Sequence, residues 1–125
     1  MKHNIFSNAE LSEEQLGVIE SRLKYISVSK GELLLRESQS VPNQFYVLKG
    51  CLRTYHIDNT GKEHTIQFAV NDWWISDYTA FFTGGLSSLN IECIQDAELV
   101  MLSRESMEKL YSEVPAVETY FRIKM

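Results

Sequence analysis

The three histidines of the chain, His3, His56 and His64, are the first side chains to consider for metal binding or for proton transfer near neutral pH. A histidine-based metal site in a β-barrel enzyme needs an H-x-H pair together with a downstream Glu and a later His, and no two of these histidines are close enough in sequence to form that pair. His56 and His64 flank a turn-forming segment, so we expect them to face each other across a hairpin and to be exposed rather than ligating. No metal site is predicted.

The two cysteines, Cys51 and Cys93, lie far apart in apolar, strand-like stretches, and the sequence has no C-x-x-C motif. We expect both to be reduced, buried residues in a cytoplasmic protein. The sequence also lacks a nucleophile elbow, a phosphate-binding loop and a dinucleotide fingerprint, and the pair Gly84-Gly85 is too short to cradle a phosphate. The chain is therefore predicted not to be an enzyme.

A cluster of small polar residues surrounds a short apolar segment near the middle of the chain. Ser76 or Asp77 could N-cap a short helix over residues 78–82, which Gly84-Gly85 would end. The inward face of that helix would comprise Tyr78, Phe81 and Phe82. Capping is the simpler interpretation of Asp77, and it is compatible with a second role in ligand binding.

Between residues 25 and 102 the apolar pattern is that of short strands separated by turn residues. The expected strands comprise residues 26–28, 33–35, 45–48, 51–57, 64–70, 91–94 and 99–102. Residues 51–57 and 64–70 flank the turn at 58–62 and should form a hairpin. Short strands at this close spacing predict a sandwich or a barrel.

Helical patterns flank the strand region on both sides. Residues 11–24 begin with a capping-box pattern formed by Ser12 and Gln15. Ser103 is a suitable N-cap for the helix that follows the last strand, and Pro115 suits the first turn of a final helix. The helix over residues 11–24 is too short to form a core alone, so it should cover another part of the fold.

Three segments carry a resemblance to a known family: residues 46–50 (YVLKG), 58–63 (DNTGKE) and 71–77 (NDWWISD). They resemble the cyclic-nucleotide-binding domain of the cyclic-AMP receptor and fumarate–nitrate regulator family, in which Y-x-V-x-x-G, D-x-x-G-K-E and G-D-x-x-G-E follow in this order. The resemblance covers nearly the whole chain. It implies a mainly-β fold: a jelly-roll β-barrel flanked by an N-terminal helix and C-terminal helices.

The same resemblance implies a domain organisation and a set of partners. Residues 1–112 would be the sensor domain, residues 113–125 would begin a dimerisation helix, and the family's DNA-binding helix-turn-helix is absent from the 125 residues. The implied partners are a small-molecule effector, a second copy in the full-length homodimer, and DNA through the missing domain only. Val117, Tyr120 and Phe121 form an apolar stripe, which we expect to be a dimerisation face peripheral to the core.

In nucleotide-binding members of the family, a Glu binds the ribose hydroxyl, an Arg pairs with the cyclic phosphate and a following Ser or Thr adds a hydroxyl. Asp77 stands at the Glu position, and Ser87-Ser88 stand at the Arg-Ser position. The predicted ligand-binding residues are Asp77, Ser87, Ser88, Ser76 and Tyr78. Because Ser87 removes the only cation of the motif, a cyclic nucleotide should bind weakly or not at all, and no cofactor is predicted.

The overall composition restricts the partners further. The net charge is −5 and the twelve basic residues are scattered, so this chain is a poor candidate for binding DNA phosphates itself. It shows no signal peptide and no stretch of about 20 apolar residues that could span a membrane. We therefore expect a cytoplasmic protein with no membrane partner.

The favoured hypothesis is an effector-sensing domain of a bacterial transcription regulator. The alternatives are a ligand-free dimerisation module and, with less support, a cupin-type metalloenzyme, since cupins share the jelly roll. Four residues could line an effector cavity, although aromatic residues on barrel strands more often belong to the core: Arg53, Tyr55, Trp73 and Trp74.

Overall fold

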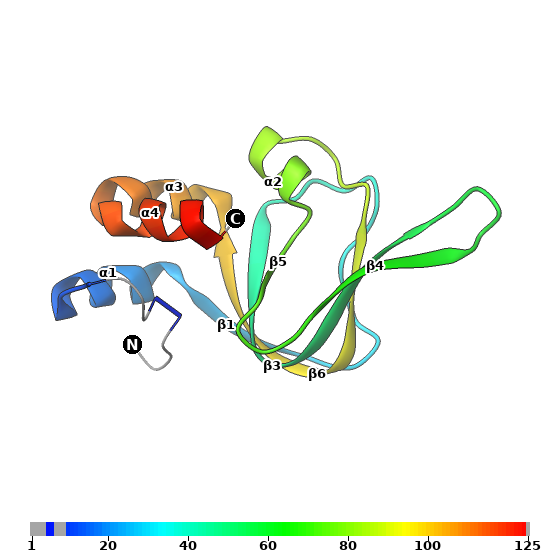
Figure 1. The fold of residues 1–125 in the computed structure, drawn as a ribbon, viewed down its shortest axis with the longest axis horizontal. Coiled ribbons are helices and arrows are strands. Elements are labelled where there is room, and N and C mark those ends of the chain that lie inside the picture. Colours follow the sequence, from blue (N-terminus) through cyan, green and yellow to red (C-terminus); the bar gives the residue numbers. More distant parts are fainter. Residues whose placement is uncertain (1–4, 7–9, 125) are drawn as a thin grey trace.

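The computed structural model describes residues 5, 6 and 10–124, which form a mainly-β chain with helices at both ends. In chain order the elements are α1 (Glu13–Arg22), β1 (Lys24–Val28), β2 (Leu33–Leu35), β3 (Asn43–Ile57), β4 (Glu63–Ala69), β5 (Trp74–Ile75), α2 (Tyr78–Thr83), β6 (Asn90–Ser103), α3 (Arg104–Glu113) and α4 (Pro115–Lys124). Helices α1, α3 and α4 gather at one end of the strands, and the β3–β4 hairpin projects from the other (Figure 1). The expected class, mainly β with flanking helices, is confirmed.

The strands form one antiparallel sheet whose order is β1-β6-β3-β4, with β2 also paired to β6 and β5 to β3. Strands β1 and β4 end this path and do not pair with each other, so among the described residues the sheet is not closed into a barrel. The barrel expected from the resemblance is thus an open one in this part of the chain. The β3–β4 hairpin extends away from the rest of the strands (Figure 1), which leaves β4 at an edge of the sheet.

The two long strands at the centre, β3 and β6, each span two of the shorter strands expected from the sequence. Gly50 occupies the point at which the sequence predicts a break in β3. Its φ is +109°, and a Cβ at this position would lie 2.6 Å from the Asp96 carbonyl oxygen and 2.7 Å from the Ala97 Cβ. The register of β3 on β6 shifts on both sides of Gly50. Because β6 leaves no room for a side chain at this position, only glycine fits here. Strand β3 bends at Gly50 and continues beyond it.

The hairpin predicted for residues 51–57 and 64–70 is confirmed by the pairing of β3 with β4, from Leu52 opposite Ala69 to His56 opposite His64. The imidazole rings of His56 and His64 stack with their centroids 4.9 Å apart, and His64 Nε2 lies 2.7 Å from Asp58 Oδ2. The described part of the chain contains no group of three or more His, Cys, Asp or Glu residues that could hold a metal ion.

The helix boundaries follow their capping residues. Ser12 and Gln15 form the predicted capping box, in which each side chain accepts a hydrogen bond from the other residue's backbone N–H, at 3.1 and 2.9 Å. Ser103 caps α3, and α4 begins at Pro115, as predicted. Arg22 and Glu113 join α1 to α3 through two hydrogen bonds of 3.1 Å, which holds the helices of both termini together.

The apolar stripe of α4 belongs to the core of the monomer. Val117, Tyr120 and Phe121 are 1%, 6% and 2% exposed, and the rings of Phe6 and Tyr120 lie 4.6 Å apart. The expectation that these three residues are peripheral to the core is wrong, because they cover the end of the sheet at which β5 lies. The apolar residue that α4 exposes is Ile123, at 78%.

The described helices include none that is long and apolar enough to cross a membrane. The two cysteines are not bonded to each other: Cys93 is buried in β6 and Cys51 is half-buried in β3, each with a free thiol.

Candidate functional site

Asp77 is the centre of the polar cluster predicted from the sequence, and it is 5% exposed. Its Oδ1 accepts a hydrogen bond from the Ala80 N–H at 3.2 Å, which caps α2. Its Oδ2 accepts from the Ser88 N–H at 2.9 Å, from the Ser87 hydroxyl at 3.1 Å and from the Ser88 hydroxyl at 3.4 Å. The predicted capping role is confirmed, and the same carboxylate holds the Ser87-Ser88 segment.

These contacts determine the charge state of the cluster. Burial acts to raise the pKa of the Asp77 carboxyl, but the backbone N–H groups of Ser88 and Ala80 and the hydroxyls of Ser87 and Ser88 hold the pKa below its ordinary value. The carboxylate is therefore ionised at neutral pH. Within the described residues no Lys, Arg or His nitrogen lies within 4.0 Å of it, so hydrogen bonds alone stabilise its charge.

The segment that carries Ser87 is also tied to the chain on its other side. The Ser87 hydroxyl donates to the Leu89 carbonyl at 2.8 Å, and the Ser87 N–H donates to the Gln39 carbonyl at 2.8 Å. The Ser38 N–H in turn donates to the Ser87 carbonyl at 2.7 Å. All three polar groups of Ser87, namely its hydroxyl, its backbone N–H and its backbone carbonyl, are thus engaged within the protein.

Ser76 and Tyr78 contact β3 instead of this cluster. The Ser76 hydroxyl donates to the Asn43 carbonyl at 2.9 Å, and the Tyr78 hydroxyl donates to Gln44 Oε1 at 3.0 Å. The structure therefore brings together three of the five predicted site residues and engages the other two with the start of β3. Phe82, expected to pack inward from α2, is 43% exposed, so that expectation is wrong, whereas Phe81 is buried.

A recess of about 550 Å³ lies elsewhere, beside the last turn of α4. Its lining residues are Gln67, Asp72, Trp73, Trp74, Tyr78 and Lys124. A second recess, of about 390 Å³, lies between β2 and the start of β3. Neither lining includes Asp77, Ser87 or Ser88.

Only part of the lining of the first recess was predictable from the sequence. Trp73 and Trp74 were expected as cavity candidates and line it, whereas Arg53 and Tyr55 do not. Gln67, Asp72 and Lys124 were missed, because they come from separate elements that only the fold brings together. The two adjacent tryptophans were the signal that the sequence offered for this recess.

Arg53 is engaged in an ion-pair network at the sheet surface. Its guanidinium lies 2.8 Å from Glu92 Oε1 and 2.7 Å from Glu63 Oε1, and it also stacks on the Tyr55 ring at 4.1 Å. The hydrogen bonds that Arg53 donates to Glu63 and Glu92 raise its pKa despite its desolvation, with the bond to Glu63 the largest cause. This cation stabilises the pairing of β3 with its two neighbours.

Comparison with known proteins places the chain in a family. Residues 25–114, which are most of the chain, match the cyclic nucleotide-binding domain. The chain belongs to this family. The jelly-roll fold of cyclic nucleotide-binding domains is therefore confirmed, with the difference that the sheet is not closed among the described residues. No curated protein sequence matches the chain.

Solved structures share the fold of this cyclic nucleotide-binding domain at low sequence identity. The catabolite activator protein of Thermus thermophilus matches with a TM-score of 0.80 and 18% identity over 97% of this chain and 55% of that protein. The sensor domain of the transcriptional regulator DNR of Pseudomonas aeruginosa matches with a TM-score of 0.78 and 16% identity, over 98% and 80% of the two chains. A cyclic nucleotide-binding domain from Methylobacillus flagellatus KT matches with a TM-score of 0.80 and 17% identity, over 97% of this chain and 70% of that chain. The chain thus spans about half the length of the catabolite activator protein.

Proposed function

We propose that this chain is the effector-sensing domain of a bacterial transcription regulator, that it is not an enzyme, and that it couples the binding of a small molecule to DNA binding by another domain. The match to the cyclic nucleotide-binding domain family supports a sensing role. The fold similarity to the DNR sensor domain and to a catabolite activator protein supports the assignment to a transcription regulator. The net charge of −5 favours contact with DNA through a different part of the regulator. The full-length regulator would act as a homodimer, as the family resemblance implies.

The Asp77 cluster, in which the carboxylate binds Ser87 and Ser88, argues against a nucleotide in the family's position. The resemblance assigns a ligand phosphate to the Ser87-Ser88 segment, yet the Asp77 carboxylate already accepts the Ser88 N–H and both serine hydroxyls. A phosphate there would have to displace a carboxylate and would meet no cation. The effector of this domain is therefore not a cyclic nucleotide bound in the family's manner.

The family fold does not by itself imply regulation by cyclic AMP. A regulatory subunit described as belonging to a cAMP-independent protein kinase A of Trypanosoma brucei shares it, with a TM-score of 0.75 and 13% identity over 98% of this chain. Fold and ligand are separate properties in such domains.

Isothermal titration calorimetry of the chain with cyclic AMP and cyclic GMP tests the ligand part of the proposal. We expect no binding, or a dissociation constant above about 10 μM, which corresponds to about 6.8 kcal/mol. The double variant Asp77→Glu, Ser87→Arg supplies the family's cation and should increase nucleotide affinity. Tight binding of either nucleotide to the unchanged chain would contradict the proposal.

A ligand screen tests the sensing role itself. The melting temperature of the chain is measured against a library of metabolites, and each stabilising compound is followed by hydrogen exchange of the α4 amides. A sensor should show a ligand that slows exchange in α4. A screen with no such ligand would favour the ligand-free dimerisation module, the alternative that the closed Asp77 cluster supports. The cupin-type alternative gains no support from the described residues.

A further inference from the structure

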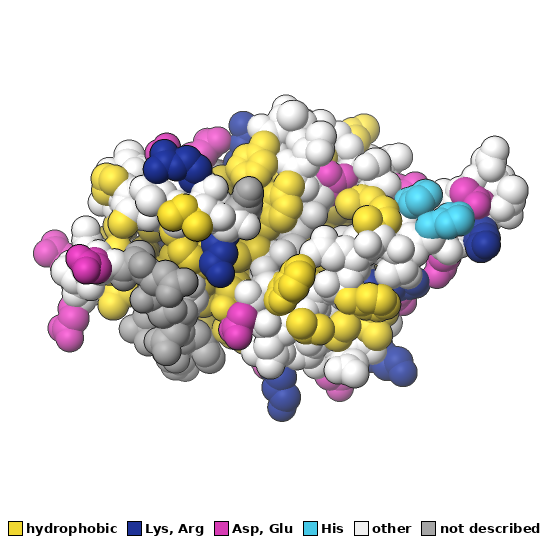
Figure 2. Space-filling view, viewed as in Figure 1, with side chains coloured by type: hydrophobic (Ala, Val, Ile, Leu, Met, Phe, Trp, Pro, Cys, Tyr) yellow, Lys and Arg dark blue, Asp and Glu magenta, His cyan; other side chains and the backbone are white. Residues whose placement is uncertain are grey.

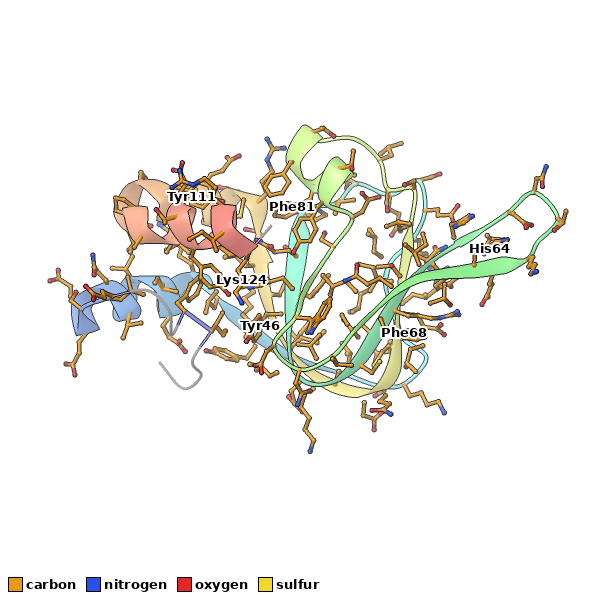
Figure 3. The ribbon with its side chains drawn as sticks, viewed as in Figure 1. Tyr46, His64, Phe68, Phe81, Tyr111 and Lys124 are labelled. Carbon is orange, nitrogen blue, oxygen red and sulfur yellow. The ribbon has the colours of Figure 1, made fainter. Side chains whose placement is uncertain are left out.

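The recess beside α4 is assembled from four separate parts of the fold. Gln67 comes from β4, Asp72, Trp73 and Trp74 from the segment that enters β5, Tyr78 from α2, and Lys124 from the last turn of α4. Its volume of about 550 Å³ lies within the range of about 300–1,000 Å³ that is usual for small-molecule sites. Figure 3 shows Lys124 at the end of the helix that faces the strands.

The two tryptophans of the recess differ in what they contact. The Trp74 ring lies edge-on to Tyr46 and Phe121, and its indole N–H donates to the Tyr120 hydroxyl at 2.9 Å. The Trp73 side chain is the opposite case: the residue is 50% exposed, and among the described residues its ring meets no other ring and its N–H has no acceptor. Trp74 therefore builds the wall, whereas Trp73 offers a free aromatic surface and a free donor.

Two further side chains of the recess, Lys124 and Gln67, also offer N–H donors that have no side-chain partner among the described residues. The ammonium of Lys124 has no carboxylate within 4.0 Å in the described part of the chain, and its nearest partner is the Tyr120 ring, with a centroid 6.0 Å away. The Gln67 amide makes no side-chain hydrogen bond to another described residue. Asp72 differs, because its Oδ1 accepts from the Tyr46 hydroxyl at 2.9 Å.

These features specify the ligand's chemistry. Free donors require a ligand with acceptor atoms, and the free indole face favours a flat ring. Lys124 attracts an anionic group, but the nearby carboxylate of Asp72 leaves the recess with no net charge, which disfavours a dianion such as a phosphate monoester. We infer that the recess binds a planar aromatic monoanion, with its ring on Trp73 and its anionic group at Lys124. This inference rests on the proposed sensing function and names its effector class.

Binding in this position would connect the sheet to the last helix. Trp73 and Gln67 belong to the sheet side of the recess, and Lys124 belongs to α4. A ligand that contacts both is bound more tightly when α4 stays docked, so by linkage it stabilises the docked position of α4. The apolar surface around β4 continues this face of the molecule (Figure 2; Phe68 is labelled in Figure 3).

The test uses trans-cinnamate as the aromatic monoanion and trans-cinnamamide as its neutral counterpart, with affinities measured by calorimetry. The chain has two tryptophans and both line the recess, so a change in tryptophan emission reports whether the bound probe is there. We expect cinnamate to bind about tenfold more tightly than the amide. Cyclic AMP, a monoanion with a flat aromatic base, is the second arm and distinguishes a nucleotide source from a carboxylate.

Two variants test the assigned contacts. Lys124→Met should reduce cinnamate affinity about tenfold and leave the amide within about twofold, whereas Lys124→Arg should keep the preference. Trp73→Leu should weaken both probes about tenfold, and Trp73→Phe should retain most of the affinity. Lys109→Met is the matched control, because Lys109 is an exposed helix lysine that pairs with Glu105 on α3.

Each result decides between named possibilities. Cyclic AMP binding that Lys124→Met weakens would keep the site and make its ligand a nucleotide. Absence of binding by either probe up to millimolar concentrations, or binding that ignores both variants, would overturn the inference. If a compound from the metabolite screen still slows exchange in α4 and its affinity is unchanged in Lys124→Met and Trp73→Leu, the sensing function stands and only the recess assignment fails.

Discussion

Asp77 uses both of its carboxylate oxygens inside its own chain, and this single residue has two structural roles. It begins α2, and it fixes the Ser87-Ser88 segment. A buried carboxylate is tolerated only when hydrogen bonds replace its hydration, which the four contacts at 2.9–3.4 Å provide. The cluster is therefore a structural requirement of this chain as well as a candidate site.

We expect Asp77→Asn to destabilise the domain by about 2 kcal/mol. An amide has only one oxygen, so its NH₂ group must face either the Ser88 N–H or the Ala80 N–H, and that N–H loses its acceptor. Urea denaturation followed by circular dichroism measures the change. Asp96→Asn is the control: Asp96 is exposed and accepts one hydrogen bond, from the Lys30 N–H at 2.8 Å, so its change should stay below about 1 kcal/mol. Equal losses of unfolding free energy in the two variants would show that the Asp77 cluster stabilises the domain no more than a single exposed hydrogen bond does.

The same cluster makes stability depend on pH. Because folding lowers the pKa of Asp77, the ionised group stabilises the folded state above its unfolded pKa of about 3.9, and this contribution is lost as the pH falls through the folded pKa. The difference in unfolding free energy between the wild type and Asp77→Asn should therefore shrink from about pH 7 to about pH 3. A difference that stays constant over this range would contradict the lowered pKa.

At the scale of single elements, the bend in β3 depends on one position. Gly50 combines a φ of +109° with atoms of β6 at 2.6–2.7 Å from where a Cβ would lie, whereas Gly31 has a φ of +92° with no atom within 4 Å of that position. We expect Gly31→Ala to cost about 1–2 kcal/mol from backbone strain alone. Gly50→Ala should cost more than about 3 kcal/mol, because the clash adds to the strain. Thermal unfolding of both variants measures the two losses of stability, and their difference is the contribution of the clash. Equal losses would contradict a clash at Gly50.

Helix α4 gives the second test at this scale. Phe121→Asp places an unpaired charge among Phe6, Trp74 and Tyr111, so it should destabilise the domain by about 4 kcal/mol or more. Ile123→Asp, on the exposed side of the same helix, should change stability by less than about 0.5 kcal/mol. Circular dichroism melts give the comparison. If the Phe121→Asp protein folds with unchanged stability, Phe121 is peripheral to the core, as the sequence had predicted.

The sequence predicted elements with local signals and missed features that depend on distant contacts. The capping box of Ser12, the N-caps Asp77 and Ser103 and the β3–β4 hairpin are encoded within a few residues, and all were predicted. Periodicity could show that Tyr120 and Phe121 share an apolar face, but it could not show that Phe6 and Trp74 cover that face. The recess was missed for the same reason, since Lys124 and Gln67 meet only in the folded chain.

For the whole molecule, the net charge argues against direct contact between this chain and DNA. The net charge is −5 and the sequence has no basic patch, so phosphate contacts would have to overcome repulsion. We expect no saturable binding of fluorescent duplex DNA by the 125-residue chain in about 150 mM salt, measured by anisotropy. Sequence-dependent binding under these conditions would contradict the proposed division of labour.

The central pairing of β3 with β6 also has a kinetic consequence. Asn43 pairs with Ser103 and Tyr55 with Asn90, so the ladder joins residues 35 to 60 positions apart in the chain. Such a ladder gains its contacts only after a long loop has been closed, and its closure entropy opposes every early encounter. The β3–β4 hairpin can form locally, within microseconds, but the chain must then wait for β6. The domain should accordingly fold on the slow, millisecond-to-second scale of high-contact-order β proteins, with β3 exposed along one side in the meantime.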